Sequence, residues 1–174
     1  MRVRRGVAAD APALAAFGAR TFIEAFGADN TPEDVAAFLA KTFGPDIQER
    51  EITNPDSITL LMDGDHGLAA YAQVRRQPAP ACVTGPKPIE IQRFYVDRPW
   101  HGRGVAQQLM QAAHDAAAEL GGATIWLGTW ERNQRGRAFY AKVGFADVGT
   151  VNFYVGSDRQ TDHIFMMPVR ASAK

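Results

Sequence analysis

Hydrophobic residues recur at helical spacing in the first part of the chain, and polar residues mark where the helices begin. Asp10 is placed to cap a helix whose apolar stripe consists of Leu14, Phe17, Phe22 and Phe26. The Thr-Pro-Glu-Asp sequence at 31–34 is the start signature of a second helix that runs to about Phe43. Pro-Asp at 45–46 opens a third, short helix. The pattern therefore predicts a helical segment before the first long strand.

The pattern then changes to the shorter period of strands. Segments 57–62 and 68–76 are predicted to form a hairpin around the Asp-Gly-Asp-His-Gly turn at 63–67. Segment 89–96 mixes apolar and β-favouring residues at strand length. Residues 3–7 are expected to add a first strand, although their arginines make the pattern weak.

Two helices and three further strands are predicted in the second half of the chain. Val105 begins an apolar helical pattern, and 125–129 reads as a strand followed by a polar connector at 131–134. A helix over 138–143 is stopped by Gly144. The segment Phe-Tyr-Val-Gly-Ser-Asp-Arg-Gln-Thr-Asp-His-Ile-Phe-Met-Met near the end looks like a closing strand pair.

The order of these elements predicts the fold class. The order is one strand, helices, three strands, a helix, a strand, a helix and two strands. This order suits an α/β (α+β) fold with one mixed, mostly antiparallel sheet of about seven strands and helices on its faces. A flavodoxin-like nucleotide domain would alternate strands and helices throughout, which the consecutive strands over 57–96 oppose. With 174 residues and no linker, 1–174 is expected to be a single domain.

Composition narrows the range of partners. Lys plus Arg and Asp plus Glu are both 19, so no global field favours nucleic acid or an anionic membrane surface. No segment approaches the roughly 18 uncharged residues of a membrane helix, and we expect a cytoplasmic protein. Cys82 is the only cysteine, and the four histidines lack metal-ligand spacing, so neither a disulfide nor a metal site is expected.

The junction after the strand at 89–96 is suited to hold a phosphate. Gly102 and Gly104 remove side chains just where the helix from Val105 begins. The first turn of a helix has N–H groups without intrahelical partners and the positive end of the helix dipole, so it stabilises an anion such as pyrophosphate. The same glycines also fit a plain tight turn between strand and helix.

Spacing excludes two better-known phosphate loops. A dinucleotide fingerprint needs a third glycine three residues after the second, and Gln107 stands there. A Walker loop ends in Gly-Lys-Ser/Thr, which this segment lacks. A short cradle of backbone amides remains.

Two segments in order carry a resemblance to a known family. The first is His-Gly-Arg-Gly-Val-Ala at 101–106, and the second is Asn133, Phe139-Tyr140 and Gly144-Phe145. Together they resemble the signature of the GNAT superfamily of N-acetyltransferases. Within that superfamily, the Trp-Leu-Gly-Thr-Trp-Glu-Arg-Asn-Gln segment and the chain's ending look most similar to bacterial polyamine acetyltransferases of the PaiA type.

The resemblance implies acetyl-CoA as co-substrate and a splay between the central parallel strands ending at Val96 and near Thr129. Backbone groups freed by that splay would pair with pantetheine and polarise the thioester carbonyl. Asn133 would reach the pantetheine arm, with a helix N-cap as its other reading. The implied cofactor-binding residues are Phe94, Tyr95, Val96, His101, Gly102, Arg103, Gly104, Val105, Ala106, Gln107, Asn133 and Tyr140.

The chain departs from the family at His101, where Gln or Arg is usual. The backbone cradle does not depend on that side chain, and an imidazole can still donate a hydrogen bond. We expect altered cofactor affinity rather than its loss. An exposed loop histidine is the alternative reading.

Acyl transfer needs one group to take a proton from the amine and another to protonate the thiolate of CoA. Tyr140 matches the family's tyrosine beside the thioester sulfur, so it is the expected acid; the alternative is a core tyrosine. Glu90, on the strand that should carry the thioester, is the expected base, directly or through a water. It would need burial to raise its pKa, and a solvated glutamate is the alternative.

The sequence leaves several acceptors open. The helices over 10–43 and the loop at 157–162 should shape the acceptor site. Their acidic residues could attract a cationic acceptor, although a solvated polar surface also explains them. These acids are Asp29, Glu33, Asp34, Asp158 and Asp162. A small-molecule amine such as the polyamine spermidine is the first expectation for the acceptor. The alternatives are a protein N-terminus, an amino acid or an amine drug. The sequence also leaves open whether the protein forms a homodimer. An acyl-CoA sensor or interaction module without turnover is the competing class, which Tyr140 and Glu90 oppose.

Overall fold

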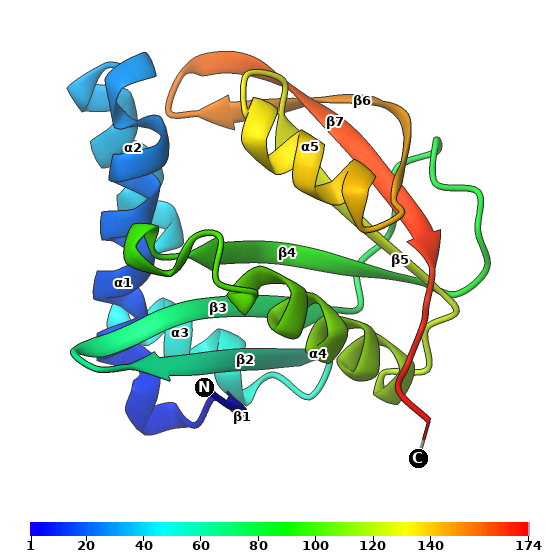
Figure 1. Ribbon diagram of the computed structural model, residues 1–174. Helices are drawn as coiled ribbons and strands as arrows, with labels where there is room; N and C mark the ends of the chain where they lie inside the picture. Colours follow the sequence, from blue (N-terminus) through cyan, green and yellow to red (C-terminus); the bar gives the residue numbers. More distant parts are fainter. Residues whose placement is uncertain (174) are drawn as a thin grey trace.

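Seven strands form one sheet in the order β1-β2-β3-β4-β5-β7-β6, and the β4–β5 pair is parallel while the other pairs are antiparallel (Figure 1). The computed structural model describes residues 1–173. The expected mixed, mostly antiparallel sheet is confirmed. The strands are β1 (Val3–Arg5), β2 (Ser57–Gly64), β3 (Gly67–Arg75), β4 (Pro88–Val96), β5 (Thr124–Trp130), β6 (Ala146–Val155) and β7 (Asp158–Pro168).

Helices cover both faces of the sheet (Figure 1). One face carries α4 and α5, the opposite face carries α1 and α3, and α2 lies against β6. The helices are α1 (Ala11–Phe26), α2 (Pro32–Thr42), α3 (Pro45–Thr53), α4 (Val105–Glu119) and α5 (Gln134–Lys142), with short 3-10 turns at Ala8–Asp10, Gly27–Asp29 and Arg98–Trp100.

The helix starts follow the predicted capping residues only in part. The Thr31 hydroxyl accepts a hydrogen bond from the Asp34 amide at 3.2 Å and caps α2 as expected. Asp10 stands at the N-cap position of α1, but its carboxylate instead accepts from the Val7 amide and forms an ion pair with Arg4. The three helices before β2 are confirmed.

The central strands are buried on both faces of the sheet. Their sequences are long apolar runs because side chains on both faces pack against helices. The β3 residues from Ala69 to Val74 are at most 2% exposed. On the α4 side, Leu109 and Ala113 pack over Ala70 and Ala72 of β3. This rigid centre holds β4 in place, and β4 carries much of the candidate site.

The two parallel strands separate halfway along their length. β4 and β5 pair only at Pro88–Thr124, Ile89–Ile125 and Glu90–Trp126. After Glu90, β4 keeps its pairing with β3 while β5 pairs with β7 alone. The second half of β4 therefore has an edge without a neighbouring strand, and the expected splay is confirmed.

Three element boundaries differ from those predicted. The α5 helix begins at Gln134 rather than near residue 138, because its first turn is polar and carries no apolar signal. The β6 strand begins at Ala146, well before the predicted closing pair, because it is an edge strand whose register shifts between Asp147 and Gly149 and breaks the alternation. The β1 strand is shorter than 3–7.

Among residues 1–173, no helix is long and apolar enough to cross a membrane.

Candidate active site

The glycine cradle is open. Gly102 and Gly104 have φ angles of +74° and +79°, a region that side-chain-bearing residues rarely adopt. A Cβ built at either position would meet no atom within 4 Å. Gly104 is the N-cap of α4, and no side chain caps it. The backbone here is shaped for an anion and left uncovered by other parts of the described chain.

His101 connects the cradle to the neighbouring elements. Its Nε2 lies 2.7 Å from the Val96 carbonyl oxygen, and its Nδ1 lies 2.6 Å from Nη1 of Arg135. Nη2 of Arg135 also lies 3.1 Å from Nε2. Because a carbonyl oxygen only accepts, Nε2 carries the hydrogen given to Val96, and Nδ1 accepts from Nη1 of Arg135. His101 is half-buried rather than a free loop side chain. The end of β4, the cradle and the first turn of α5 are thereby joined.

Phe94, Tyr95 and Val96 lie on the free edge of β4 and line the same cavity as the cradle. The Val96 carbonyl already accepts from His101, so fewer of its acceptor sites are free than the sequence-based expectation assumed. The other backbone groups of this edge have no β5 partner.

Asn133 caps the helix that carries Tyr140. Its Oδ1 accepts from the Gly136 amide at 3.0 Å, and its Nδ2 donates to Thr129 Oγ1 at 3.3 Å. A Cβ at Gly136 would lie 2.5 Å from Nδ2, so the glycine makes room for the cap. Asn133 is thus the N-cap of α5, and its side chain also lines the cavity.

Tyr140 is 8% exposed and lies in a cage of aromatic rings. Its ring centroid is 6.3 Å from that of Phe94 and 5.9 Å from those of Phe145 and Phe165. It also lines the cavity, so it is both a core residue and a site residue. Burial raises the pKa of the phenol well above its usual value, which keeps the proton on it at neutral pH.

Glu90 lies at the closed end of the splay, where β4 and β5 still pair. Its carboxylate accepts from Arg75 Nε at 2.6 Å. Glu90 and Phe94 pair with Arg75 and Ala72 of β3, which are three residues apart, so they are separated by about 10 Å along the strand. Gln92 is the extra residue of a bulge in β4, so Glu90 falls on the sheet face covered by α1 and α3, and Phe94 on the face of Tyr140. The two predicted catalytic residues therefore project from opposite faces of the sheet, and both line the same cavity.

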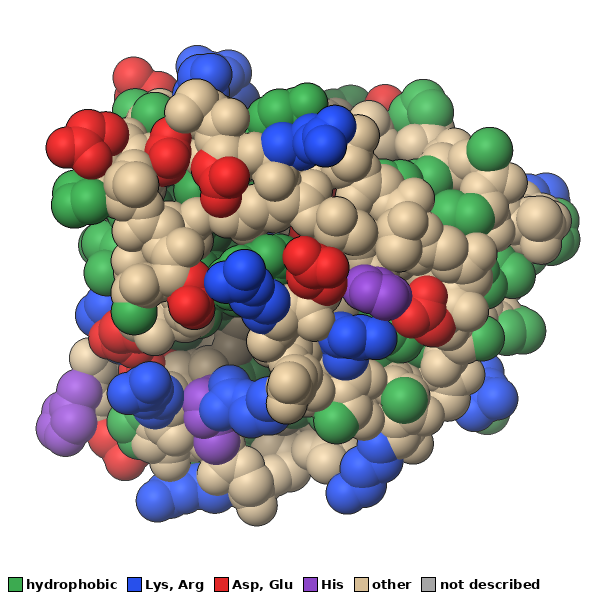
Figure 2. Space-filling model, turned by 90° about the horizontal axis from the view of Figure 1, so that it is seen from above, with side chains coloured by type: hydrophobic (Ala, Val, Ile, Leu, Met, Phe, Trp, Pro, Cys, Tyr) green, Lys and Arg blue, Asp and Glu red, His purple; other side chains and the backbone are tan. Residues whose placement is uncertain are grey.

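A cavity of about 1210 Å³ runs along the splay, and charged side chains surround the hollow at the surface (Figure 2). Arg103 and Val105 of the predicted cofactor set do not line it. Val105 is buried in the core, and the Arg103 guanidinium stacks over Trp100. The predicted residues that do line it are Glu90, Phe94, Tyr95, Val96, His101, Gly102, Gly104, Ala106, Gln107, Asn133 and Tyr140.

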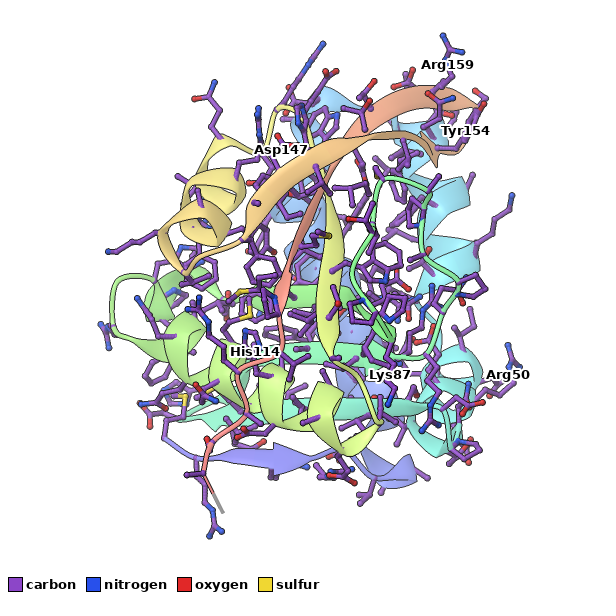
Figure 3. All side chains as sticks on the ribbon, turned by 90° about the vertical axis from the view of Figure 1, so that its right-hand side faces the viewer. Arg50, Lys87, His114, Asp147, Tyr154 and Arg159 are labelled. Atoms are coloured by element: carbon purple, nitrogen blue, oxygen red, sulfur yellow. The ribbon has the colours of Figure 1, made fainter. Side chains whose placement is uncertain are left out.

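Of the five acids proposed for the acceptor, the cavity is lined by Asp29 and Asp162. Asp34 instead accepts from the amide and hydroxyl of Ser157 and ties α2 to the β6–β7 turn. Asp158 accepts from Gln160, and Glu33 is exposed away from the cavity. The turn itself lies at the end of the hairpin marked by Tyr154 and Arg159 (Figure 3).

The acceptor side of the cavity has aromatic walls that sequence reasoning missed. Phe26 meets Trp130 edge to face at 5.7 Å, and Phe38 lies 5.8 Å from Phe153. All five residues from Trp126 to Trp130 of β5 line the cavity. The predicted strand at 125–129 could have indicated this wall, but only the splay shows that it faces an opening.

Most acidic side chains lining the cavity already have a cationic partner. Ion pairs join Glu24 and Asp97 to Arg20, Glu51 to Arg93, and Glu90 to Arg75. Within residues 1–173, no group of three or more His, Cys, Asp or Glu side chains could hold a metal ion.

A parallel strand pair that splays beside an open helix N-terminus, with a buried tyrosine at the gap, defines a site for an acyl donor carried on a phosphate-bearing arm. Residues 22–145 match the acetyltransferase (GNAT) family, and the chain belongs to that family of acyltransferases.

Similarity to individual proteins extends over nearly the whole chain. An uncharacterized N-acetyltransferase from Lactobacillus delbrueckii subsp. lactis is 35% identical over 155 residues, which cover 89% of this chain and 90% of that protein. The fold is similar to that of a PaiA N-acetyltransferase from Thermoplasma acidophilum in complex with coenzyme A, at 16% identity, with a TM-score of 0.76 and coverage of 96% and 98%. It is also similar to yncA from Salmonella typhimurium with its cofactor acetyl-CoA, at 17% identity, a TM-score of 0.67 and coverage of 100% and 96%.

Proposed function

We propose that this protein moves the acetyl group of acetyl-CoA to a primary amine of a small molecule, with polyamines such as spermidine as the first acceptor class. The observation that carries the proposal is one cavity that contains the open cradle of Gly102 and Gly104, the free edge of β4 and Tyr140. Membership of the acetyltransferase family supports the same reaction.

The residues present fit coenzyme A. The positive φ angles and empty space at Gly102 and Gly104 suit a diphosphate, which the helix N-terminus stabilises. The free β4 edge at 94–96 suits the amide groups of pantetheine, as an added strand would. The thioester of acetyl-CoA supplies an activated acetyl group at this edge.

Tyr140 acts as the acid that protonates the departing sulfur. Its buried phenol keeps its proton at neutral pH, and it projects from α5 into the cavity. Glu90 is the base predicted from the sequence, directly or through a water. It lines the cavity but is held by Arg75, so this role requires a connecting water or release of the ion pair.

The acceptor enters from the side of α1, α2 and the β6–β7 hairpin. Asp29 at the rim and Asp162 deeper in the cavity are two negative groups at different depths, which suits an amine with more than one cationic centre. Protein N-termini, amino acids and amine drugs are the other acceptors to compare.

The test is release of free thiol from acetyl-CoA in the presence of spermidine and a panel of other amines. We expect amine-dependent release that saturates with spermidine at lower concentration than with monoamines. Saturable binding of acetyl-CoA with no thiol release from any amine would instead support a sensor without turnover. Failure to bind CoA would overturn the proposal as a whole.

A further inference from the structure

We propose that Asp162 binds the ammonium group of the acceptor and takes the proton that this group loses before it attacks. The inference rests on the proposed function and deepens it by naming the group that recognises the amine.

Asp162 is a buried carboxylate, and one of its oxygens is left without a hydrogen-bond partner in the part of the chain that the structure describes. The residue is 9% exposed, and its Oδ1 has no hydrogen-bond partner among residues 1–173. An unpaired buried carboxylate costs free energy, so buried acids are usually paired or hydrogen-bonded. The acids Glu51, Glu90 and Asp97 in the same cavity follow that rule through arginines, and Asp162 does not. A cationic ligand would complete the arrangement.

Space is left beside this carboxylate by a glycine. Gly128 of β5 pairs with Ile164 of β7, two residues after Asp162, and a Cβ at Gly128 would lie 3.3 Å from Asp162 Oδ2. Gly128 is not among the residues with positive φ, so its backbone conformation does not require glycine. Glycine within a strand weakens the strand and often marks a close approach of another group. Here it keeps the wall beside the carboxylate open.

Asp162 and Tyr140 line the same cavity from opposite faces of the sheet. Burial raises the pKa of Tyr95 to about 12, Arg93 opposes this effect, and the negative charge of Asp162 adds to it. Burial likewise raises the pKa of Tyr140, with a smaller contribution from Tyr95. Tyr95 on the free edge of β4 lines the same cavity as Asp162 and Tyr140. An amine held by Asp162 would meet a thioester placed next to Tyr140.

The surroundings also suit an alkyl ammonium ion. Phe26 and Trp130 meet edge to face at 5.7 Å, and Phe22 stacks on Phe38 at 4.3 Å, so apolar walls line the cavity near the carboxylate. Aromatic rings tolerate carbon chains and attract cations. Burial raises the pKa of Asp162 to about 6, an effect that His163 opposes, which suits a group that must accept a proton near neutral pH.

The ammonium nitrogen gives one proton to a carboxylate oxygen of Asp162 and then forms a C–N bond to the acetyl carbonyl carbon. The C–S bond breaks, and the sulfur takes the phenolic proton of Tyr140. The second proton lost by the new amide nitrogen returns to Tyr140 through water, and Asp162 releases its proton to solvent. No oxidant, metal or further reactant is needed.

The experiment compares the wild-type chain with Asp162→Asn, which keeps size and removes charge, and with Asp65→Asn, an exposed control on the β2–β3 turn. Calorimetry measures binding of spermidine, n-hexylamine and neutral n-hexanol to protein saturated with CoA, which cannot transfer an acetyl group. We expect Asp162→Asn to weaken amine binding at least about tenfold and to leave hexanol and CoA binding unchanged, and Asp65→Asn to change nothing. Equal amine binding by Asp162→Asn and wild type, or no amine binding by wild type, would overturn the inference.

Turnover separates this inference from the proposed function. If the wild type acetylates an amine and Asp162→Asn does so with the same kcat/KM, the role of Asp162 falls and the acetyltransferase function stands. If the wild type binds amines through Asp162 without releasing thiol, the proposed function and the proton transfer fail while the ammonium site stands. A fall in kcat beyond the loss of amine affinity supports proton transfer as well as binding.

Discussion

The imidazole of His101 bridges the last residue of β4 and the first turn of α5, with Nε2 at 2.7 Å from the Val96 carbonyl oxygen and Nδ1 at 2.6 Å from Nη1 of Arg135. The side chain that departs from the family's usual Gln or Arg therefore organises the cradle through hydrogen bonds to two elements.

His101→Ala is expected to raise the KM for acetyl-CoA by roughly 3- to 10-fold with a smaller change in kcat, because the cradle loses hydrogen bonds of about 1 kcal/mol. Steady-state kinetics at a saturating amine concentration measure both constants. His101→Gln should restore most of the affinity, since an amide can still donate to Val96. His66→Ala, at an exposed turn, is the control, and an unchanged KM in His101→Ala would contradict the bridging role.

Tyr140→Phe is expected to lower kcat by about 100-fold, because general acid catalysis contributes at least that much. The aromatic packing with Phe94 and Phe145 is retained, so CoA affinity and the melting temperature should change little. Tyr154→Phe at the exposed end of the hairpin (Figure 3) is the matched control. Turnover equal to wild type would remove Tyr140 from its proposed role.

The pH dependence of turnover should follow the direction of the pKa shifts. Burial raises the pKa of Tyr140 well above its usual value, so no loss of kcat from its ionisation is expected between pH 7 and about 9. Burial raises the pKa of Asp162 to about 6, with His163 opposing, so kcat/KM for the amine should fall as pH drops through about 6. In Asp162→Asn that fall should disappear, and its persistence would assign the titration to another group.

Asp162 should also make folding stability depend on pH. Burial raises its pKa from the usual 3.8 to about 6 in the folded state. The folded chain therefore binds more protons than the unfolded chain, and stability decreases as pH rises from about 4 to about 6. Asp162→Asn should be more stable than wild type at pH 8 by about 1–3 kcal/mol, and no more stable at pH 4. Urea unfolding at the two pH values measures the difference; equal stability at pH 8 would contradict the buried, unpaired charge.

Gly136→Ala should displace the cap of α5, because the added Cβ would lie 2.5 Å from Asn133 Nδ2. A loss of about 0.5–2 kcal/mol of stability is expected, similar to that in Asn133→Ala, which removes the same cap. The double variant should lose little more than either single one, as residues acting through one contact are not additive. Additive losses in urea unfolding would show that the two residues act separately.

Glu90→Gln tests the base predicted from the sequence. Arg75 would lose an ion pair at 2.6 Å, so stability should decrease by about 1 kcal/mol. If Glu90 takes the proton from the amine, Glu90→Gln should lower kcat and change the low-pH side of the pH–rate profile. If Asp162 takes that proton, Glu90→Gln should change kcat by less than about threefold and leave the low-pH side of the profile as in the wild type. Glu90→Gln and Asp162→Asn are compared at the same acetyl-CoA concentration.

Local chemistry made several elements predictable. Thr31 and Pro32 fix the start of α2, and the apolar stripe from Leu14 to Phe26 fixes the face of α1, because caps and periodicity act within one or two turns. The glycine cradle was predictable for the same reason. The polar first turn of α5 and the bulged edge strand β6 were placed wrongly, since neither gives a regular apolar period.

The sequence by itself determined the order of strands and helices, the cradle at Gly102 and Gly104, and the family through Asn133 and Tyr140. Only the tertiary structure decided which acids share a cavity, because that depends on where β4 and β5 separate and on contacts between residues distant in the chain. It paired Glu90 with Arg75 and left Asp162 Oδ1 without a hydrogen-bond partner among residues 1–173. The physical reason is that the fate of a charge depends on burial and on neighbours supplied by other strands, which no local pattern contains.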